Sequence, residues 1–189
     1  MPAHDLGFHT VDDVLAIPSD GQRYELVYGR LLVSPAPTLQ HERIVRKLAM
    51  ALHVFCDRHG LGEAFGVIAD LTWGRRDVLV QPDIFVMGAA DRHARGWEEV
   101  RHVPLVAEIL SPATRTYDRF DKRRVYQDRN VALYWVIDPR SRTAEIWTPE
   151  AEAPVVERER LVWAPAGVGE VFSMELNELF VSIESQLGL

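Results

Sequence analysis

The sequence predicts a mixed β-sheet flanked by helices, an α/β or α+β architecture that forms one domain over residues 1–189. Three observations lead to this prediction. Short runs rich in β-branched and aromatic residues alternate with two longer amphipathic segments. Hydrophobic residues make up 47% of the chain, which is enough for one substantial core but not for two. Turn residues separate nearly all of the apolar runs.

The first third of the chain predicts a short helix, a hairpin and a long helix. Thr10 is a favourable N-cap for a helix beginning at "VDDVL". Residues 23–35, "RYELVYGRLLVSP", contain two apolar runs about Gly29 and predict a β-hairpin. Residues 41–59 place apolar side chains on one stripe and are followed by Gly60, which predicts a helix with a glycine stop.

The rest of the chain predicts strands around one further internal helix. Residues 64–73 and 77–87 favour an antiparallel pair of strands. Residues 104–110 predict a central strand because both of its faces are apolar. A helix is expected over 114–130, ending at Asn130, because asparagine tolerates a left-handed cap. The last predictions are a hairpin of 132–139 with 143–148, an edge strand over 155–165, and a terminal helix over 173–188 that docks Leu176, Leu179, Phe180 and Ile183 on the sheet.

The composition argues against several classes of protein. A net charge of −7 is unsuited to coating nucleic acid, but it is compatible with cutting it through metal-binding carboxylates. No apolar run approaches the roughly 18 to 20 residues of a membrane span, and the first residues lack a signal-peptide pattern, so we expect a cytoplasmic protein without membrane contact. Cys56 lies on an apolar stripe, which predicts a small buried side chain. We find no zinc-binding histidine motif, phosphate-binding glycine loop or serine elbow.

Three ionisable residues stand out by their positions. Asp83 in "QPDIFV" and Glu108 in "VAEIL" fall in strands predicted to be buried, where an unpaired carboxylate is costly. Two such acids on neighbouring strands can share one divalent cation, Mg²⁺ or Mn²⁺. The alternative for either acid is a salt bridge with an arginine. Lys122 is one of only two lysines among 21 basic residues.

The predicted internal helix offers a partner for Glu108. Asp118, Lys122 and Tyr126 are spaced so that they share one face of this helix. If the helix packs over the preceding strand, the Lys122 ammonium can approach Glu108. The alternative is an ordinary surface pair between Asp118 and Lys122, worth only a few tenths of a kcal/mol.

Taken in order, these motifs resemble a known family. The set consists of Pro82–Asp83, "AEILSPAT" at 107–114, Asp118, Lys122 and Tyr126 on the helix, and "LYWVIDP" at 133–139. It resembles the Uma-type family of "putative restriction endonucleases", a branch of the PD-(D/E)XK nuclease superfamily. The resemblance extends from "YELVYGRLLVSPAP" to about Trp147. What it implies is a restriction-endonuclease-like core with a mixed sheet and flanking helices.

The resemblance also implies a site and a reaction. Asp83, Glu108 and the backbone carbonyl of Ile109 would bind Mg²⁺, and a lysine would help to activate water for phosphodiester cleavage. The superfamily's lysine lies two positions after the acid, where this chain has Leu110. The resemblance therefore implies that the lysine has migrated to the helix, as Lys122.

Further candidates surround this trio. Glu25 could be an additional ligand or a hydrogen-bond acceptor near the metal, the alternative being a pair with Arg23 or Arg30. His41, at the start of the long predicted helix, could contact phosphate. We interpret Trp97 as an anchor for its loop, the alternative being a residue that stacks on a base. A basic rim could be formed by Arg75, Arg76, Arg92, Arg95, Arg101, Arg115, Arg119, Arg123 and Arg124.

Three functions are compatible with these residues. The leading hypothesis is a Mg²⁺-dependent DNA endonuclease that acts as a homodimer when it cuts both strands. The alternative is a non-catalytic module that binds nucleic acid or protein on the same fold. A third is a nuclease acting on RNA or on a mobile-element intermediate.

Overall fold

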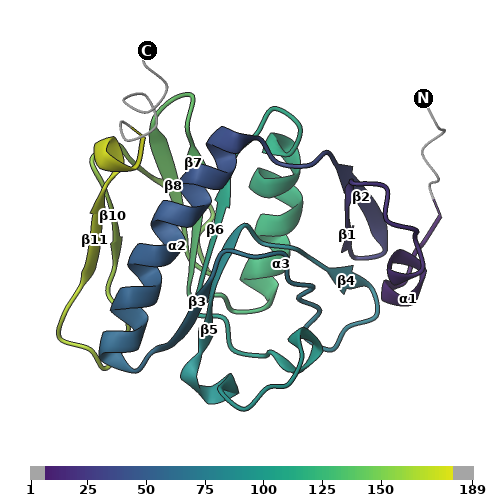
Figure 1. Ribbon diagram of the computed structural model, residues 1–189, viewed down its shortest axis with the longest axis horizontal. Helices are drawn as coiled ribbons and strands as arrows, with labels where there is room; N and C mark the ends of the chain where they lie inside the picture. The colour runs from purple at the N-terminus through teal and green to yellow at the C-terminus, as the bar shows by residue number, and fades with distance from the viewer. Residues whose placement is uncertain (1–6, 181–189) are drawn as a thin grey trace.

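The computed structural model describes residues 7–180 and has a six-stranded mixed sheet at its centre (Figure 1). The strand order is β3-β5-β6-β7-β8-β9. Strands β6 and β7 are parallel, and the other neighbouring pairs are antiparallel. The strands of this sheet are β3 (Gly62–Phe65), β5 (Ile84–Gly88), β6 (Leu105–Ile109), β7 (Leu133–Asp138), β8 (Thr143–Trp147) and β9 (Val155–Glu157).

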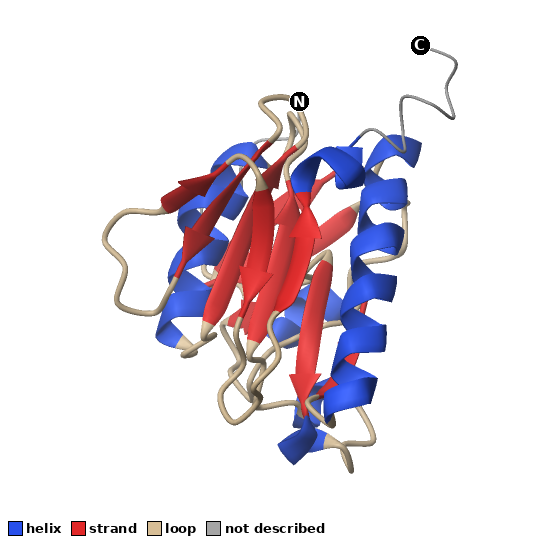
Figure 2. Ribbon diagram, turned by 90° about the vertical axis from the view of Figure 1, so that its left-hand side faces the viewer, coloured by secondary structure: helices blue, strands red, loops and turns tan. Residues whose placement is uncertain are grey.

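Helices cover both faces of this sheet, which confirms the predicted fold class (Figure 2). Helix α2 (Leu39–His59) lies on one face, and α3 (Arg123–Asp128) lies on the other. Strand β6 alternates between the two layers as a period of two requires. Its residues Leu105, Ala107 and Ile109 pack in the core layer of α2, whereas Val106 packs in the layer of α3.

Helix α2 is set by its caps and by one apolar stripe. The Thr38 side chain accepts a hydrogen bond from the His41 N–H at 3.2 Å, and Gly60 ends the helix in the left-handed conformation, with φ of 63°. The helix therefore begins at Leu39, two residues before the predicted start. The buried stripe includes Leu48 and Cys56, so the predicted burial of the cysteine is confirmed.

The predicted N-terminal hairpin is confirmed. Strands β1 (Arg23–Val27) and β2 (Arg30–Ser34) pair antiparallel around a two-residue turn, Tyr28 and Gly29. Both turn residues have positive φ, 50° and 80°, which is the backbone that tight hairpins favour. A Cβ on Gly29 would also overlap the Phe8 ring. Before the hairpin, Thr10 caps α1 (Val11–Leu15), as predicted.

The pair predicted over 64–73 and 77–87 is only partly correct. Strand β3 ends at Phe65, and the following residues form no strand apart from one bridge, between Leu71 and Val80. The second run divides at Pro82, which has no N–H for a strand ladder. Its first part, β4 (Val78–Leu79), pairs with β1, and its second part becomes β5, which pairs with β3 as predicted. Asp83 consequently lies where the chain passes from the three-stranded sheet β2-β1-β4 to the central sheet.

The internal helix lies within its predicted range but contains a wider turn. A π-helical turn, η3 (Tyr117–Lys122), runs directly into α3. The Tyr134 hydroxyl donates to the Asp118 carbonyl at 2.9 Å, which gives that backbone oxygen a partner from strand β7. Asn130 has φ of 53°, so the predicted left-handed end is confirmed.

The carboxyl-terminal third departs most from prediction. The β7–β8 hairpin is confirmed, but the strand predicted over 155–165 is two strands. Strand β9 extends the central sheet, whereas β10 (Arg160–Trp163) pairs with β11 (Phe172–Glu175). The helix predicted from Ser173 is wrong at its start because Phe172 and Met174 alternate with exposed Ser173 and Glu175, which is strand periodicity. Residues 176–180 are helical, and Leu176, Leu179 and Phe180 are buried. Ile183 lies outside the described residues.

Two short 3₁₀ turns shape the long connection after β5. They are η1 (Ala89–Asp91) and η2 (Trp97–Glu99). The Trp97 ring meets the rings of Phe65 and Phe85 edge-on, with centroids 5.1 and 5.7 Å away, so the predicted role of a loop anchor is confirmed. No helix within residues 7–180 is long and apolar enough to cross a bilayer.

The α2 stripe gives a direct test of the packing. Leu48 is fully buried, and Met50 is 58% exposed on the same helix. We expect Leu48→Ala to lower the free energy of unfolding by about 2 to 5 kcal/mol because it leaves a core cavity. Met50→Ala should change it by less than about 0.5 kcal/mol. Urea unfolding measures both, and equal losses would contradict this packing of α2.

Candidate active site

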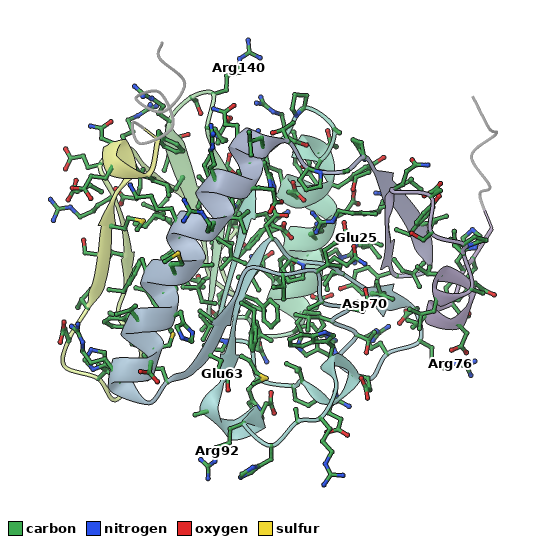
Figure 3. All side chains as sticks on the ribbon, in the orientation of Figure 1. Glu25, Glu63, Asp70, Arg76, Arg92 and Arg140 are labelled. Atoms are coloured by element: carbon green, nitrogen blue, oxygen red, sulfur yellow. The ribbon has the colours of Figure 1, made fainter. Side chains whose placement is uncertain are left out.

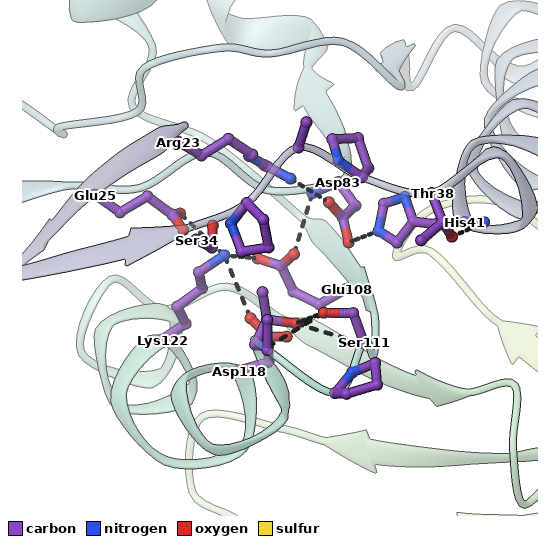
Figure 4. A pocket seen from close by; sticks show the side chains of 16 residues that line it. Arg23, Glu25, Ser34, Thr38, His41, Asp83, Glu108, Ser111, Asp118 and Lys122 are labelled. Atoms are coloured by element: carbon purple, nitrogen blue, oxygen red, sulfur yellow. Dashed lines mark hydrogen bonds and ion pairs between the residues drawn. The ribbon is translucent and has the colours of Figure 1, made fainter. Parts of the chain in front are cut away.

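One cavity of about 160 Å³ is lined by seven ionisable side chains, which come from five parts of the chain (Figure 4). They come from β1, the first turn of α2, the residue before β5, strand β6 and the turn η3. All except Arg23 are at least nine-tenths buried. The seven residues are Arg23, Glu25, His41, Asp83, Glu108, Asp118 and Lys122.

Lys122 is the centre of this cluster. Its ammonium nitrogen lies 2.9 Å from Glu25 Oε1, 3.1 Å from Glu108 Oε1 and 3.3 Å from Asp118 Oδ1. The residue is only 2% exposed, so the alternative of a surface pair between Asp118 and Lys122 is wrong. The predicted approach of the ammonium to Glu108 is present, as Figure 4 shows.

Glu108 is held on both of its oxygens. Oε1 accepts from Lys122 and from the Tyr126 hydroxyl, the latter at 2.7 Å. Oε2 accepts the backbone N–H of Asp83 at 3.2 Å. Leu110, at the superfamily's usual lysine position, is buried in the apolar layer. The only ammonium that contacts Glu108 among residues 7–180 is therefore the one on the helix.

Asp83 is engaged by two basic side chains and one backbone donor. Arg23 Nη1 lies 2.9 Å from Oδ1, and His41 Nε2 lies 2.9 Å from Oδ2. The N–H of Ile109 also donates to Oδ2 at 2.9 Å. The salt-bridge alternative thus describes Asp83, whereas the partner of Glu108 is Lys122. His41 is buried against Asp83 instead of lying at the surface for phosphate.

Burial and charge move the pKa values of these acids in opposite directions. Burial raises the pKa of Asp83, but the hydrogen bond and charge of His41, with Arg23, outweigh it and lower the pKa below its usual value. Burial raises the pKa of Glu108 well above its usual value, although the Lys122 charge opposes this. Burial likewise raises the pKa of Asp118 to about 6 against the same charge.

The basic groups respond to the same neighbours. Burial would lower the pKa of Lys122, but its three carboxylate partners outweigh that effect and raise it well above the usual value. The pKa of His41 is also raised, because its contacts with Asp83 outweigh its burial. Lys122 therefore keeps its proton at neutral pH in this arrangement.

The cluster holds more potential negative than positive charge. The lining has four carboxylates, from Glu25, Asp83, Glu108 and Asp118, against two permanent cations and one histidine. Carboxylate oxygens are hard donors, and a site with an excess of negative charge suits a divalent cation such as Mg²⁺ or Mn²⁺. Within residues 7–180, however, no three His, Cys, Asp or Glu side chains are gathered as a ready-made metal site. A cation in this cavity would therefore have to be held by fewer than three of these side chains, with backbone oxygen or water as its other ligands.

The remaining candidates occupy supporting positions. Glu25 pairs with Lys122 instead of Arg23 or Arg30, and its Oε1 also accepts the Gln81 N–H at 2.7 Å. Tyr126 touches Glu108 but does not line the cavity. Sequence reasoning considered Arg23 only as a partner for Glu25. The signal was the spacing of "RYE", because Arg23 and Glu25 lie two apart and share one face of β1.

Comparison with a solved structure defines the class of fold. A crystal structure from Anabaena variabilis, described as "a putative nuclease belonging to DUF820", superposes with a TM-score of 0.71. The match covers 92% of this chain and 98% of that chain, at 22% sequence identity. The present chain thus has the fold of that nuclease-like protein.

Comparison with family models then gives the family. The model of Uma2, described as "Putative restriction endonuclease", matches residues 11–176. The chain belongs to the Uma2 family, which confirms the resemblance seen in its motifs. A search of curated proteins found no match.

The buried acid on η3 predicts a particular pH dependence. The pKa of Asp118 is about 6 in the folded protein, against an ordinary value of 3.8. Between these values the folded chain retains a proton that the unfolded chain has lost, so this group lowers the free energy of unfolding as pH rises. The variant Asp118→Asn lacks this contribution. Its free energy of unfolding, relative to wild type, should therefore increase from about pH 4 to about pH 7.

Urea unfolding of both proteins across that range measures the difference. A relative stability that stays constant or falls with pH would contradict the assignment of a protonated Asp118 beside Lys122.

Proposed function

We propose that this protein is a Mg²⁺-dependent endonuclease that hydrolyses phosphodiester bonds in DNA. The observation that supports this proposal most strongly is the fully buried ammonium of Lys122 beside Glu108, in a cavity that Asp83 also lines. Asp83, Glu108 and the Ile109 carbonyl are the proposed metal ligands. A bound Mg²⁺ supplies a water of lowered pKa and neutralises charge on the phosphate.

The chain's own residues have distinct proposed roles. Lys122 keeps its proton, so it stabilises negative charge that develops on the phosphate instead of acting as a base. Tyr126 fixes the Glu108 carboxylate by donating to Oε1, while Oε2 accepts the backbone N–H of Asp83. Glu25 and Asp118 hold the ammonium in place.

His41 and Arg23 act on the other acid. Both contact Asp83 at 2.9 Å and keep it ionised, which is the state that binds a cation. These contacts use both carboxylate oxygens of Asp83. A cation bound to Asp83 would therefore have to share an oxygen with one of them.

That requirement favours a second candidate function. Asp83 already has Arg23, His41 and the Ile109 N–H as partners, so its charge is balanced within the chain. A non-catalytic module that binds nucleic acid or protein would keep such a cluster for structural reasons alone.

A homodimer with two sites is part of the nuclease proposal, because one site cuts one strand.

Plasmid nicking separates the two candidates. We expect wild type to nick supercoiled DNA in Mg²⁺ or Mn²⁺ and not in EDTA. Asp83→Asn, Glu108→Gln and Lys122→Met should each lower the rate by at least about 100-fold, because each removes a group that acts on the reacting phosphate or its metal.

The matched control is Lys47→Met, which changes the chain's only other lysine; Lys47 lies on α2, donates to the Glu178 backbone carbonyl and does not line the cavity. It should keep wild-type activity. Far-UV circular dichroism checks that each variant is folded. Nicking that survives all three site substitutions would refute the assigned residues, and a wild type that binds DNA without ever cutting it would favour the non-catalytic module.

A further inference from the structure

A second groove, of about 500 Å³, opens beside the carboxylate cavity. The two hollows share four lining residues, so they are adjacent. Parallel strands β6 and β7 end at this groove, with Ile109 and Asp138 in its lining. Crevices at the carboxyl ends of parallel strands are common ligand sites in α/β sheets. The shared residues are Thr38, His41, Ser111 and Pro112.

Most arginines of the predicted basic rim are engaged elsewhere. Arg75 makes a two-pronged pair with Asp77, at 2.7 and 2.6 Å. Arg119 donates to Glu145 at 2.7 Å, and the Arg123 guanidinium lies over the Trp147 ring, 4.5 Å from its centroid. These side chains stabilise the fold and none of them lines the groove.

Two other arginines do line the groove. The Arg115 side chain is 40% exposed and reaches Asp138 Oδ2 at 3.4 Å. Arg140 is exposed and follows β7, and Figure 3 shows its side chain extending from the edge of the molecule. Among residues 7–180, Arg140 is held through its backbone N–H, which donates to Asp138 Oδ1 at 2.9 Å.

The acid beneath these arginines is occupied. Asp138 is 5% exposed and accepts from the N–H groups of Arg140 and Ser141, with Arg119 3.5 Å away. Asp138 therefore positions the Arg115 guanidinium and the backbone of Arg140, and its charge is already paired with Arg115 and Arg119. The groove consequently has a positive rim next to an acidic cavity.

We propose that this groove binds a backbone phosphate adjacent to the phosphodiester being cut, through Arg115 and Arg140. The inference rests on the proposed nuclease function and adds the path of the substrate strand. A strand whose reacting phosphate lies at the Lys122 cavity continues into the groove across Ser111 and Pro112. Planar guanidinium groups match phosphate oxygens in geometry and charge.

Binding of a short DNA duplex, followed by fluorescence anisotropy in EDTA at several salt concentrations, tests the groove without relying on cleavage. Arg115→Gln and Arg140→Gln should each weaken binding by roughly 10-fold, because each removes a charged donor to phosphate. Each should also lower the slope of log affinity against log salt by about one.

Arg58→Gln is the matched control. Arg58 carries the same charge, is 62% exposed and lies in the last turn of α2, whereas His41, which lines the groove, lies in the first. It should bind DNA as wild type does. Urea unfolding confirms that Arg115→Gln keeps its fold, because that side chain also contacts Asp138.

A methylphosphonate placed next to the cleaved bond gives a second, independent measurement. Neutralising that phosphate should weaken wild-type binding by roughly 10-fold and weaken Arg140→Gln little further, because the two changes remove the same contact. If wild type binds and cuts DNA while both groove variants behave like Arg58→Gln, the phosphate subsite is refuted and the nuclease proposal stands. If wild type neither binds nor cuts, the nuclease proposal fails, and the subsite fails with it.

Discussion

The buried ammonium of Lys122 contacts carboxylates from three separate parts of the structure. Lys122 joins Glu25 of the N-terminal hairpin, Glu108 of the central sheet and Asp118 of its own helical segment. A lysine that is 2% exposed is tolerated only when its lost hydration is replaced by close, well-placed acceptors. The position of the hairpin over the central sheet therefore depends on a charge contact as well as on apolar packing. The same contact fixes the geometry of the cavity.

The cluster is arranged in a way that structural salt bridges rarely require. Four carboxylates line one cavity with two permanent cations, and burial raises the pKa of Glu108 and Asp118. Apolar residues of similar volume would stabilise the fold at least as well. Strained electrostatics of this kind concentrate at functional sites, where the unfavourable energy is offset by binding or catalysis. Under the proposed function, a divalent cation bound by Asp83 and Glu108 would offset the excess of negative charge.

Much of the site could be predicted because it depends on local periodicity and composition. Period-two alternation puts Glu108 on the same face of β6 as Val106, which packs in the layer of α3, and the scarcity of lysine singled out Lys122. The partners of Asp83 were beyond reach because Arg23 and His41 lie 60 and 42 residues away in sequence, so only the folded topology brings them together. The pairing of Val78–Leu79 with β1 was missed because the two strands lie far apart in sequence. The strand at Phe172–Glu175 was missed because its period-two pattern is only four residues long.

Anomalous diffraction from crystals soaked in Mn²⁺ tests the central claim most directly, because it locates the cation without relying on activity. If Asp83 and Glu108 bind the cation, one strong peak per chain will lie inside the cavity, within ligand distance of both acids, and it will be lost in Glu108→Gln. A peak at any other position, or a cavity that stays empty while Asp83 keeps its contacts with Arg23 and His41 at high Mn²⁺, would contradict it.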